Sequence, residues 1–388
     1  MNTKKLERLI KKSPIIQRLY IFFGSLFFSF VGLFVRTKQN RVLFSSFSGK
    51  QFSDSPKIIY EKMQERYGDK LEYIWALDHP DRFPELTCQK VRMNSLKYFL
   101  VALSSKYWVT NVNIEKGMRF KKRATRYLNT WHGVCLDFIG NDRPKRKDYD
   151  FRKIQFMTIC GSFEECSFAS AFRIGDSQML KVGLPRNDRL LSGNLDVRSL
   201  KEELGIPLNK KIILYAPTWR ENSDLKTNDS FLIPLDISRW KELFAKKYVL
   251  LFRAHSITKN LTNASFDDFF INVSAFPDTN KLLSAVDILI TDYSSILFDF
   301  SLLERPIFNF GYDYEEYCLS HGFYVDYASE MPNGIIRKED DLIDAIANID
   351  LDLQREKTIA LKEKYMNYSL PNSTDLCVDA LLGESVIL

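Results

Sequence analysis

From Arg41 onward, the chain alternates short apolar segments typical of strands with segments of helical periodicity. Alternation of this kind predicts a parallel sheet with helices on both faces. It is interrupted at residues 192–210, where Gly, Asn and Pro flank one short helix, and it then resumes. The sequence therefore predicts an α/β fold with two Rossmann-like lobes, residues 41–195 and 196–388, and a ligand cleft at the carboxyl ends of the strands.

The expected strands are short runs rich in β-branched and aromatic residues. In the first lobe they are residues 41–47, 71–77, 106–111, 126–131, 154–160 and 178–183. In the second lobe they are residues 211–219, 248–255, 269–274, 287–292 and 306–311. We also expect a helix to begin at residues 53–56, where Ser and Asp can cap it and Pro fits its first turn.

The segment before this alternation has a different character. Residues 1–41 carry nine Lys or Arg and one acidic side chain, so the chain's positive excess, +6 overall, is concentrated there. They flank Leu19–Val35, an uncharged run with six Phe whose length is near the lower limit of roughly 17–25 residues for a spanning helix. Basic residues on both sides of an apolar run favour an anionic membrane surface, not nucleic acid, as the partner.

We therefore interpret residues 1–40 as a membrane-associating segment, for which three arrangements remain open. The segment can lie in the membrane interface as a monotopic anchor, cross the membrane once, or pack as a core helix. Its basic flanks argue against the core helix. No small-x-small cleavage site precedes Arg36, so we do not expect a removed signal peptide.

The sequence offers no established binding motif for a metal or a cofactor. Its six cysteines form no C-x-x-C pair, and no histidine has zinc-finger spacing. Walker A and G-x-G-x-x-G motifs are also absent from the chain. We therefore expect neither a metal site nor a cofactor, and any diphosphate ligand would have to be held without a glycine-rich loop.

Two of the four histidines lie directly after predicted strands, one in each lobe. His132 follows residues 126–131, and His255 ends residues 248–255. The carboxyl ends of strands are where an α/β cleft receives its catalytic groups, and imidazole can exchange a proton near neutral pH. A structural role is the commoner one for a histidine, but this paired placement favours a catalytic role for both.

Further polar side chains gather at strand ends of the second lobe. They are Thr218, Arg220, Arg253, Asp292, Ser294 and Ser295. An arginine fork and the N–H groups at a helix N-terminus both suit phosphate, although Ser and Asp are also ordinary helix caps. Their convergence on one lobe indicates a site for a diphosphate-bearing substrate. Gly183–Asp188, at the lobe boundary, is either a rigid turn or a part of the cleft.

Several motifs, in this order, resemble one known family. They are SFSGKQFSDSPKIIYE, TWHG, GLPRND, YAPTWR, RAHS, TDYSSILFDF, RPIFNFGYDYEEY and GFYVDY, which together cover roughly residues 41–340. On these motifs the chain is similar to the CDP-glycerol glycerophosphotransferase family of teichoic acid synthesis. The resemblance implies a GT-B-like fold and a monotopic enzyme on the cytoplasmic face of the cell membrane.

The resemblance also implies the reaction. The donor would be CDP-glycerol or CDP-ribitol, the acceptor a lipid-linked polymer of the teichoic acid type, and the released product CMP. Carried over by motif, His132 would be the base. The residues that would hold the donor pyrophosphate are Arg253, His255, Ser294 and Ser295.

The chain departs from the family pattern beside both histidines. The family often continues TWHG with TPLKKIG, whereas Val134–Gly140 reads VCLDFIG here, and Ser256 stands where Pro is frequent. Two rival functions remain: a GT-B glycosyltransferase that uses a nucleotide sugar, and a membrane-bound nucleotide sensor without catalysis. The two histidines favour an enzyme. The motifs leave open whether the donor carries glycerol or ribitol, and whether the enzyme is a primase or a polymerase.

Overall fold

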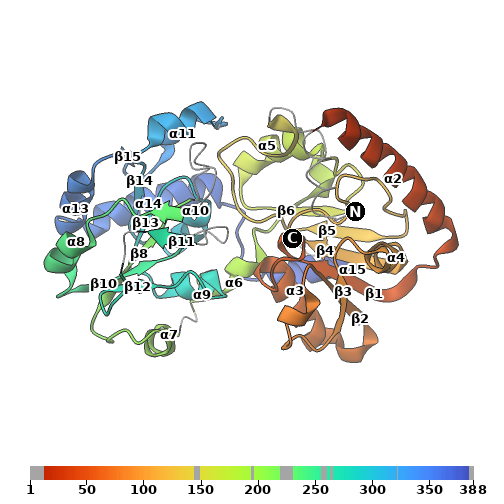
Figure 1. Cartoon of the computed structure of the whole chain (residues 1–388), viewed down its shortest axis with the longest axis horizontal. Helices are drawn as coiled ribbons and strands as arrows, with labels where there is room; N and C mark the ends of the chain where they lie inside the picture. Colours follow the sequence, from red (N-terminus) through yellow and green to blue (C-terminus); the bar gives the residue numbers. More distant parts are fainter. Residues whose placement is uncertain are drawn as a thin grey trace. The chain divides into compact units, whose positions relative to one another are not determined.

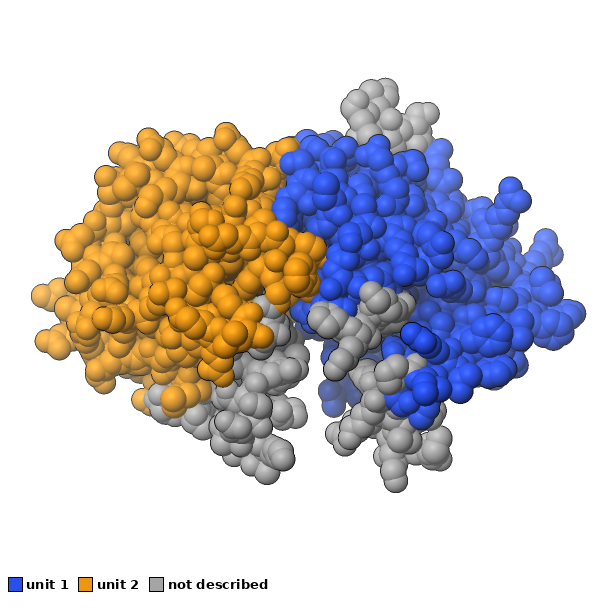
Figure 2. All heavy atoms as spheres, turned by 90° about the horizontal axis from the view of Figure 1, so that it is seen from above, with its two compact units in different colours: residues 1–132, 139–186, 368–388 blue, residues 133–138, 187–367 orange. Residues whose placement is uncertain are grey.

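The computed structural model describes residues 13–143, 149–193, 196–218, 230–254, 260–262, 265–320 and 322–383. By packing, the chain divides into two compact units, which Figure 2 shows in two colours. The first lobe consists of Met1–His132, Ile139–Arg186 and Tyr368–Leu388, and the second lobe of Gly133–Phe138 and Asn187–Asn367. Each lobe is built on a parallel sheet, which confirms the predicted α/β class with two lobes.

The first lobe has a seven-stranded parallel sheet in the order β3-β2-β1-β4-β5-β6-β7. The strands are β1 (Lys38–Ser45), β2 (Glu72–Leu77), β3 (Gln89–Arg92), β4 (Ser105–Thr110), β5 (Arg126–Asn129), β6 (Phe156–Ile159) and β7 (Met179–Lys181). The helices are α2 (Pro14–Phe34), α3 (Asp54–Tyr67), α4 (Leu96–Ser104), α5 (Ser162–Phe172) and α15 (Ser373–Leu382). The sequence did not predict β3, because this edge strand is mostly polar and buries only Val91.

One face of this sheet is covered by α3 and α15 (Figure 1). Met63 of α3 and Val378 of α15 belong to the same buried cluster as side chains of β1 and β2. Ion pairs also join the two helices, with Arg66 Nη2 2.6 Å from Asp375 Oδ1. The end of the chain thus belongs to the first lobe, whereas the sequence placed all of residues 196–388 in the second. No local pattern reveals which lobe a terminal helix packs against.

The second lobe has a six-stranded parallel sheet in the order β12-β10-β8-β13-β14-β15. Its strands are β8 (Lys211–Ala216), β10 (Tyr248–Phe252), β12 (Phe270–Asn272), β13 (Ile288–Thr291), β14 (Ile307–Phe310) and β15 (Ile335–Ile336). A separate two-stranded sheet pairs β9 (Ser230–Leu232) with β11 (Asn260–Thr262). Every residue of β10 and β13 is buried, as expected for parallel strands covered on both faces.

The helices of the second lobe lie before, between and after these strands in the chain. They are α6 (Asp188–Leu191), α7 (Val197–Glu203), α8 (Ile237–Phe244), α9 (Thr279–Ser284), α10 (Ile296–Ser301), α11 (Tyr314–Ser320), α12 (Tyr327–Glu330), α13 (Glu339–Ala347) and α14 (Leu351–Tyr365). Trp240 of α8 and Ile343 of α13 pack in one buried cluster with Tyr215 of β8 and Phe252 of β10. Because the strands are parallel, the carboxyl ends of β8, β10 and β13 lie at one edge of the sheet. The predicted donor residues Thr218, Arg253, Asp292, Ser294 and Ser295 lie there.

Helix α2 has one side packed on the first lobe (Figure 1). Gly24 permits close packing, since a Cβ there would lie 2.5 Å from Met118 Sδ. Phe28 stacks on Phe99 of α4, with ring centroids 4.1 Å apart. Residues Ile15–Phe34 are long and apolar enough to cross a membrane, with a mean hydropathy of 1.5, and only 6% of this stretch is buried. The core-helix arrangement is therefore wrong.

The other side of α2 is an apolar face exposed to solvent. Its large exposed side chains are Ile15, Ile16, Leu19, Tyr20, Phe22, Phe23, Leu26, Phe27, Phe30, Leu33 and Phe34. They recur at helical spacing along the whole helix, so they form one continuous surface, called here the apolar face of α2. An exposed apolar surface of this extent is unusual for a soluble monomer and marks an interaction surface.

Candidate active site

His132 lies just beyond the carboxyl end of β5, in a turn of unusual backbone conformation. Trp131 has a φ of +50° and Gly133 a φ of +137°, a region that favours glycine. The side chain of Asn129, the last residue of β5, accepts a hydrogen bond from the Trp131 backbone N–H (2.9 Å). The sequence thus ends the strand and turns the chain so that His132 is displayed at the sheet edge.

The imidazole of His132 is held in a defined orientation. Its Nδ1 lies 2.7 Å from the backbone carbonyl oxygen of Asn111, which directly follows β4. A carbonyl can only accept, so Nδ1 carries the hydrogen, and in the neutral ring Nε2 holds the lone pair. The ring of Trp131 lies against the imidazole, with centroids 4.2 Å apart, and Phe47 lies 5.8 Å away. This arrangement can accept a proton at Nε2.

Backbone strain gathers around this turn. Phe47, Ser48, Asp54 and Trp131 are non-glycine residues with positive φ, between +45° and +65°. Phe47 and Ser48 lie in the loop between β1 and α3, and Asp54 is the first residue of α3. The Phe47 N–H donates to the side chain of Asn111 (2.8 Å). Such strained residues persist only where the surroundings enforce them, and they cluster at functional sites. The loop after β1 is therefore part of the candidate site.

An ion pair that is largely buried contacts the turn that carries His132. Arg186 Nη1 lies 2.6 Å from Asp54 Oδ2, and the two side chains are only 10% and 7% exposed. The same Nη1 donates to the backbone carbonyl of His132 at 3.2 Å. The sequence left Gly183–Asp188 as a turn or a cleft segment and did not single out Asp54. The structure assigns Arg186 and Asp54 to the neighbourhood of His132.

In the second lobe, Asp292 organises the ends of two neighbouring strands. It follows β13, is 1% exposed, and accepts hydrogen bonds from both the N–H (2.8 Å) and the hydroxyl (2.6 Å) of Thr218. Thr218 follows β8, which is paired with β13. Asp292 also accepts from the Tyr293 N–H at 2.6 Å. Thr218 and Asp292, both predicted to bind donor, are thus brought together and bonded to each other.

Ser294 and Ser295 follow directly and lead into α10. Both are partly exposed, and Ser294 Oγ accepts a weak hydrogen bond from the Ile296 N–H at 3.4 Å. Ser295 is the N-cap residue of α10, and its side chain makes no capping hydrogen bond. Both serines therefore lie just beyond the carboxyl end of β13, as the sequence predicted.

Arg253 lies at the end of β10 with its guanidinium directed into the protein. Nη1 donates to the carbonyls of Val273 (3.0 Å) and Phe276 (2.9 Å), and Nη2 donates to Thr279 Oγ1 (2.9 Å). Burial lowers the pKa of this guanidinium. These contacts brace the loop between β12 and α9, a role that the sequence did not predict. Arg220 and His255 lie outside the described residues.

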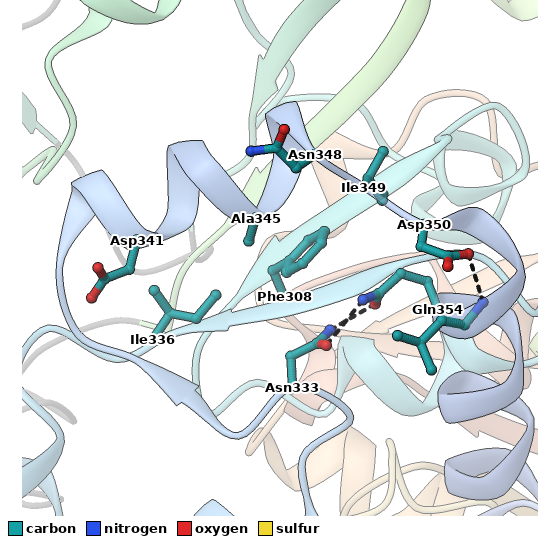
Figure 3. A pocket seen from close by; sticks show the side chains of 10 residues that line it. Phe308, Asn333, Ile336, Asp341, Ala345, Asn348, Ile349, Asp350 and Gln354 are labelled. Carbon is teal, nitrogen blue, oxygen red and sulfur yellow. Dashed lines mark hydrogen bonds between the residues drawn. The ribbon is translucent and has the colours of Figure 1, made fainter.

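A hollow of about 320 Å³ lies elsewhere in the second lobe, among β14, β15, α13 and α14 (Figure 3). Its lining residues are Phe308, Asn333, Ile336, Asp341, Ala345, Asn348, Ile349, Asp350, Leu353 and Gln354. Asn333 and Gln354 bond to each other there through their side-chain amides (2.7 and 3.0 Å). None of the ten is a predicted site residue. Among the described residues, no group of three or more His, Cys, Asp or Glu could hold a metal ion.

Comparison with known proteins identifies the family. The family model for CDP-Glycerol:Poly(glycerophosphate) glycerophosphotransferase matches residues 27–383, nearly the whole chain. The chain belongs to this family. Members of the family are phosphotransferases, so the expectation of an enzyme of this class is confirmed.

Relatives in the family include enzymes for two different alditols. The chain is 33% identical, over 332 residues, to a teichoic acid glycerol-phosphate transferase of Staphylococcus aureus, covering 80% of this chain and 84% of that one. It is 27% identical, over 397 residues, to the teichoic acid ribitol-phosphate polymerase TarL of the same organism, covering 98% and 68%. A poly(glycerol phosphate) polymerase of Staphylococcus epidermidis is 33% identical, but the chain spans only 46% of its length.

Comparison with solved structures supports the same family. The structure of a variant of the wall teichoic acid polymerase TagF superimposes with a TM-score of 0.80 at 29% identity, covering 89% of each chain. One TagF structure was determined after a soak with CDPG. The GT-B-like fold expected from the family motifs is therefore confirmed.

Proposed function

We propose that the protein transfers glycerol phosphate from CDP-glycerol to a lipid-linked polymer of the teichoic acid type and releases CMP. Family membership supports the reaction class. The observation that carries the mechanism is the hydrogen bond from His132 Nδ1 to the carbonyl of Asn111, which leaves Nε2 as the basic nitrogen. Nε2 accepts the proton of the acceptor hydroxyl, the oxygen attacks the β-phosphorus of the donor, and the bond to CMP breaks.

The donor is proposed to lie at the carboxyl edge of the second-lobe sheet. Ser294 and Ser295 offer hydroxyls to the pyrophosphate, and Asp292 and Thr218 hold the strand ends from which they project. Arg253 acts mainly by bracing the loop after β12. Arg220 and His255 complete the proposed set on the sequence alone: the arginine fork suits phosphate, and the histidine is proposed to stabilise the leaving group. Hydrogen-bond donors placed in advance stabilise the charge that develops on the leaving CMP.

The donor alditol is proposed to be glycerol. Of the two Staphylococcus aureus relatives, the glycerol-phosphate enzyme is 33% identical to this chain and the ribitol-phosphate enzyme 27%. The test is to incubate the protein and a lipid-linked acceptor with CDP-glycerol, CDP-ribitol or a UDP-sugar and to measure the released nucleotide. We expect CMP from CDP-glycerol at the highest rate. UDP release would indicate a glycosyltransferase, and tight CDP-glycerol binding without CMP release would indicate a sensor.

Helix α2 is proposed to lie in the membrane interface on the cytoplasmic face, as a monotopic anchor and not as a span. Its packed side is fixed to the first lobe along its length, by Gly24 against Met118, Phe28 against Phe99, and Lys122 Nζ, which donates to the Val35 carbonyl at its end. A spanning helix would have to leave these contacts. The apolar face of α2 remains available to the acyl boundary, where amphipathic helices bind.

Charges on the apolar face of α2 should therefore release the protein from membranes. Phe23, Phe27 and Phe30 are 55–59% exposed, and each buried Phe contributes about 1.5–3 kcal/mol. The triple change to Glu is expected to move the protein to the soluble fraction with an unchanged melting temperature. Leu319→Glu, at a residue 90% exposed in the second lobe, serves as the control. Membrane sedimentation of the triple variant at the wild-type level would contradict the anchor. Deletion of residues 1–38 is less clean, because it also uncovers Phe99.

A further inference from the structure

Two consecutive residues mark the passage of the chain from the first lobe to the second. Arg186 is the last residue of a first-lobe segment, and Asn187 begins the long second-lobe segment. Both belong to the short 3-10 turn Pro185–Asn187. The side-chain hydrogen bonds described below join Arg186 to residues of the first lobe and Asn187 to residues of the second lobe.

Arg186 is fixed to the turn that carries His132. Its Nη1 bonds Asp54 Oδ2 (2.6 Å) and the His132 carbonyl (3.2 Å), and its backbone N–H donates to Ser55 Oγ (3.3 Å). An ion pair with this little exposure contributes little net stability, since desolvation offsets its attraction. The ion pair does fix the guanidinium of Arg186, which donates a hydrogen bond to the backbone carbonyl of the proposed base, His132.

Asn187 is fixed to the helices beside the donor residues. It is 1% exposed, and its amide donates to Asp299 Oδ1 (2.8 Å) and accepts from Asn280 Nδ2 (2.6 Å). Asp299 lies in α10, the helix that follows Ser294 and Ser295, and Asn280 lies in α9 beside Thr279, which Arg253 contacts. Asn187 therefore joins the two helices that flank the proposed donor site.

We propose that Arg186 and Asn187 are positioning residues with separate duties: Arg186 places the base His132, and Asn187 places the donor-binding end of α10. This inference rests on the proposed roles of His132 and of Ser294 and Ser295. Neither residue needs to touch a substrate. A displacement of about 1 Å at a catalytic group can cost about 100-fold in rate, so small changes in these contacts have large effects.

Substitutions at these two adjacent residues should therefore affect different quantities: saturated turnover for Arg186 and donor affinity for Asn187. Arg186→Lys keeps the charge but not the fork, and it should lower turnover at saturating CDP-glycerol at least about tenfold with donor affinity unchanged. Asn187→Leu should weaken CDP-glycerol binding at least about tenfold with much smaller loss of saturated turnover. Arg189→Lys is the control, because its ion pair with Asp278 (3.1 Å) is exposed, and it should change neither quantity.

A double variant tests whether the effect of Arg186→Lys comes from an unfolded protein. Asp54→Asn with Arg186→Met removes both charges together, so no buried charge is left uncompensated, and it should reproduce the turnover loss of Arg186→Lys. Wild-type turnover in this double variant, or equal losses of affinity and turnover in the Arg186 and Asn187 variants, would overturn the proposal. His132→Ala, measured in the same experiment, separates a failure of the proposed function from a failure of the positioning role. An active His132→Ala refutes the proposed function, whereas an inactive one beside a fully active Arg186→Lys refutes only the positioning role.

Discussion

His132→Ala is expected to lower CMP release by about 100- to 10,000-fold, the usual cost of losing a general base. An alditol hydroxyl is a poor nucleophile until a positioned group takes its proton, and Nε2 of His132 is the proposed group. The donor residues are in the other lobe, so affinity for CDP-glycerol should not change. Melting temperature, donor affinity and CMP release should be measured on the same preparation.

His79→Ala is the matched control for this variant. His79 lies in the same lobe, and its side chain is 51% exposed after β2. Its removal should leave all three quantities at the wild-type level. If His132 only braced the end of β5, His132→Ala would instead lower the melting temperature and reduce activity modestly. A stable variant that keeps more than about a tenth of wild-type turnover is incompatible with a general base at this position.

Asp292→Ala is expected to damage both the stability and the donor affinity of the second lobe. The carboxylate is 1% exposed and accepts from the Thr218 N–H, the Thr218 hydroxyl and the Tyr293 N–H. Hydrogen bonds to charged groups contribute about 1.5–3 kcal/mol each, so the free energy of unfolding should fall by several kcal/mol. Because Ser294 follows two residues later, CDP-glycerol affinity should fall at least about tenfold.

Thr218→Val separates the hydroxyl from the rest of this network. It removes one hydrogen bond to Asp292 and keeps the one from the Thr218 backbone N–H. The loss of stability should therefore be about 1–3 kcal/mol, clearly smaller than for Asp292→Ala. Chemical denaturation and donor titration measure both quantities. Wild-type stability and donor affinity in Asp292→Ala would show that Asp292 does not organise this edge of the sheet.

The sequence could predict which site residues lie at the ends of strands. Strand positions follow from short apolar runs, and polar residues after such runs meet at one sheet edge. His132, Asp292, Ser294 and Ser295 were placed in this way, and in the structure each of them lies just beyond the carboxyl end of a strand, β5 for His132 and β13 for the other three.

The partners of these residues could not be predicted in the same way. Arg186 reaches Asp54 across 132 residues of sequence, and no local pattern reports such a contact. The strained φ of Asp54 has no signature either, because the residue is not a glycine. Arg253 stays a predicted pyrophosphate ligand, and its hydrogen bonds to the carbonyls of Val273 and Phe276 have no signature in the sequence, because they depend on the folded loop after β12.

For helix α2, too, the sequence predicted the element but not its contacts. The sequence showed an apolar run with basic flanks, which left three arrangements open. Only the packing of Phe28 on Phe99, and of Gly24 against Met118, reveals that one side of the helix is occupied by the first lobe. Gly24 and Gly32 are positions of close approach to this lobe, because a Cβ at them would lie 2.5 Å from Met118 Sδ and 3.1 Å from Leu103 Cδ2.

The central claim is that a glycerol phosphate unit passes from CDP-glycerol to a polymer end with His132 as the base. The most direct measurement is to follow CMP release and the mass of a lipid-linked acceptor in one reaction, for the wild type and for His132→Ala. The account predicts that the wild-type acceptor gains one glycerol phosphate for each CMP released, and that neither product forms at a comparable rate in His132→Ala. Release of CMP without growth of the acceptor, or growth at the wild-type rate in His132→Ala, would contradict it.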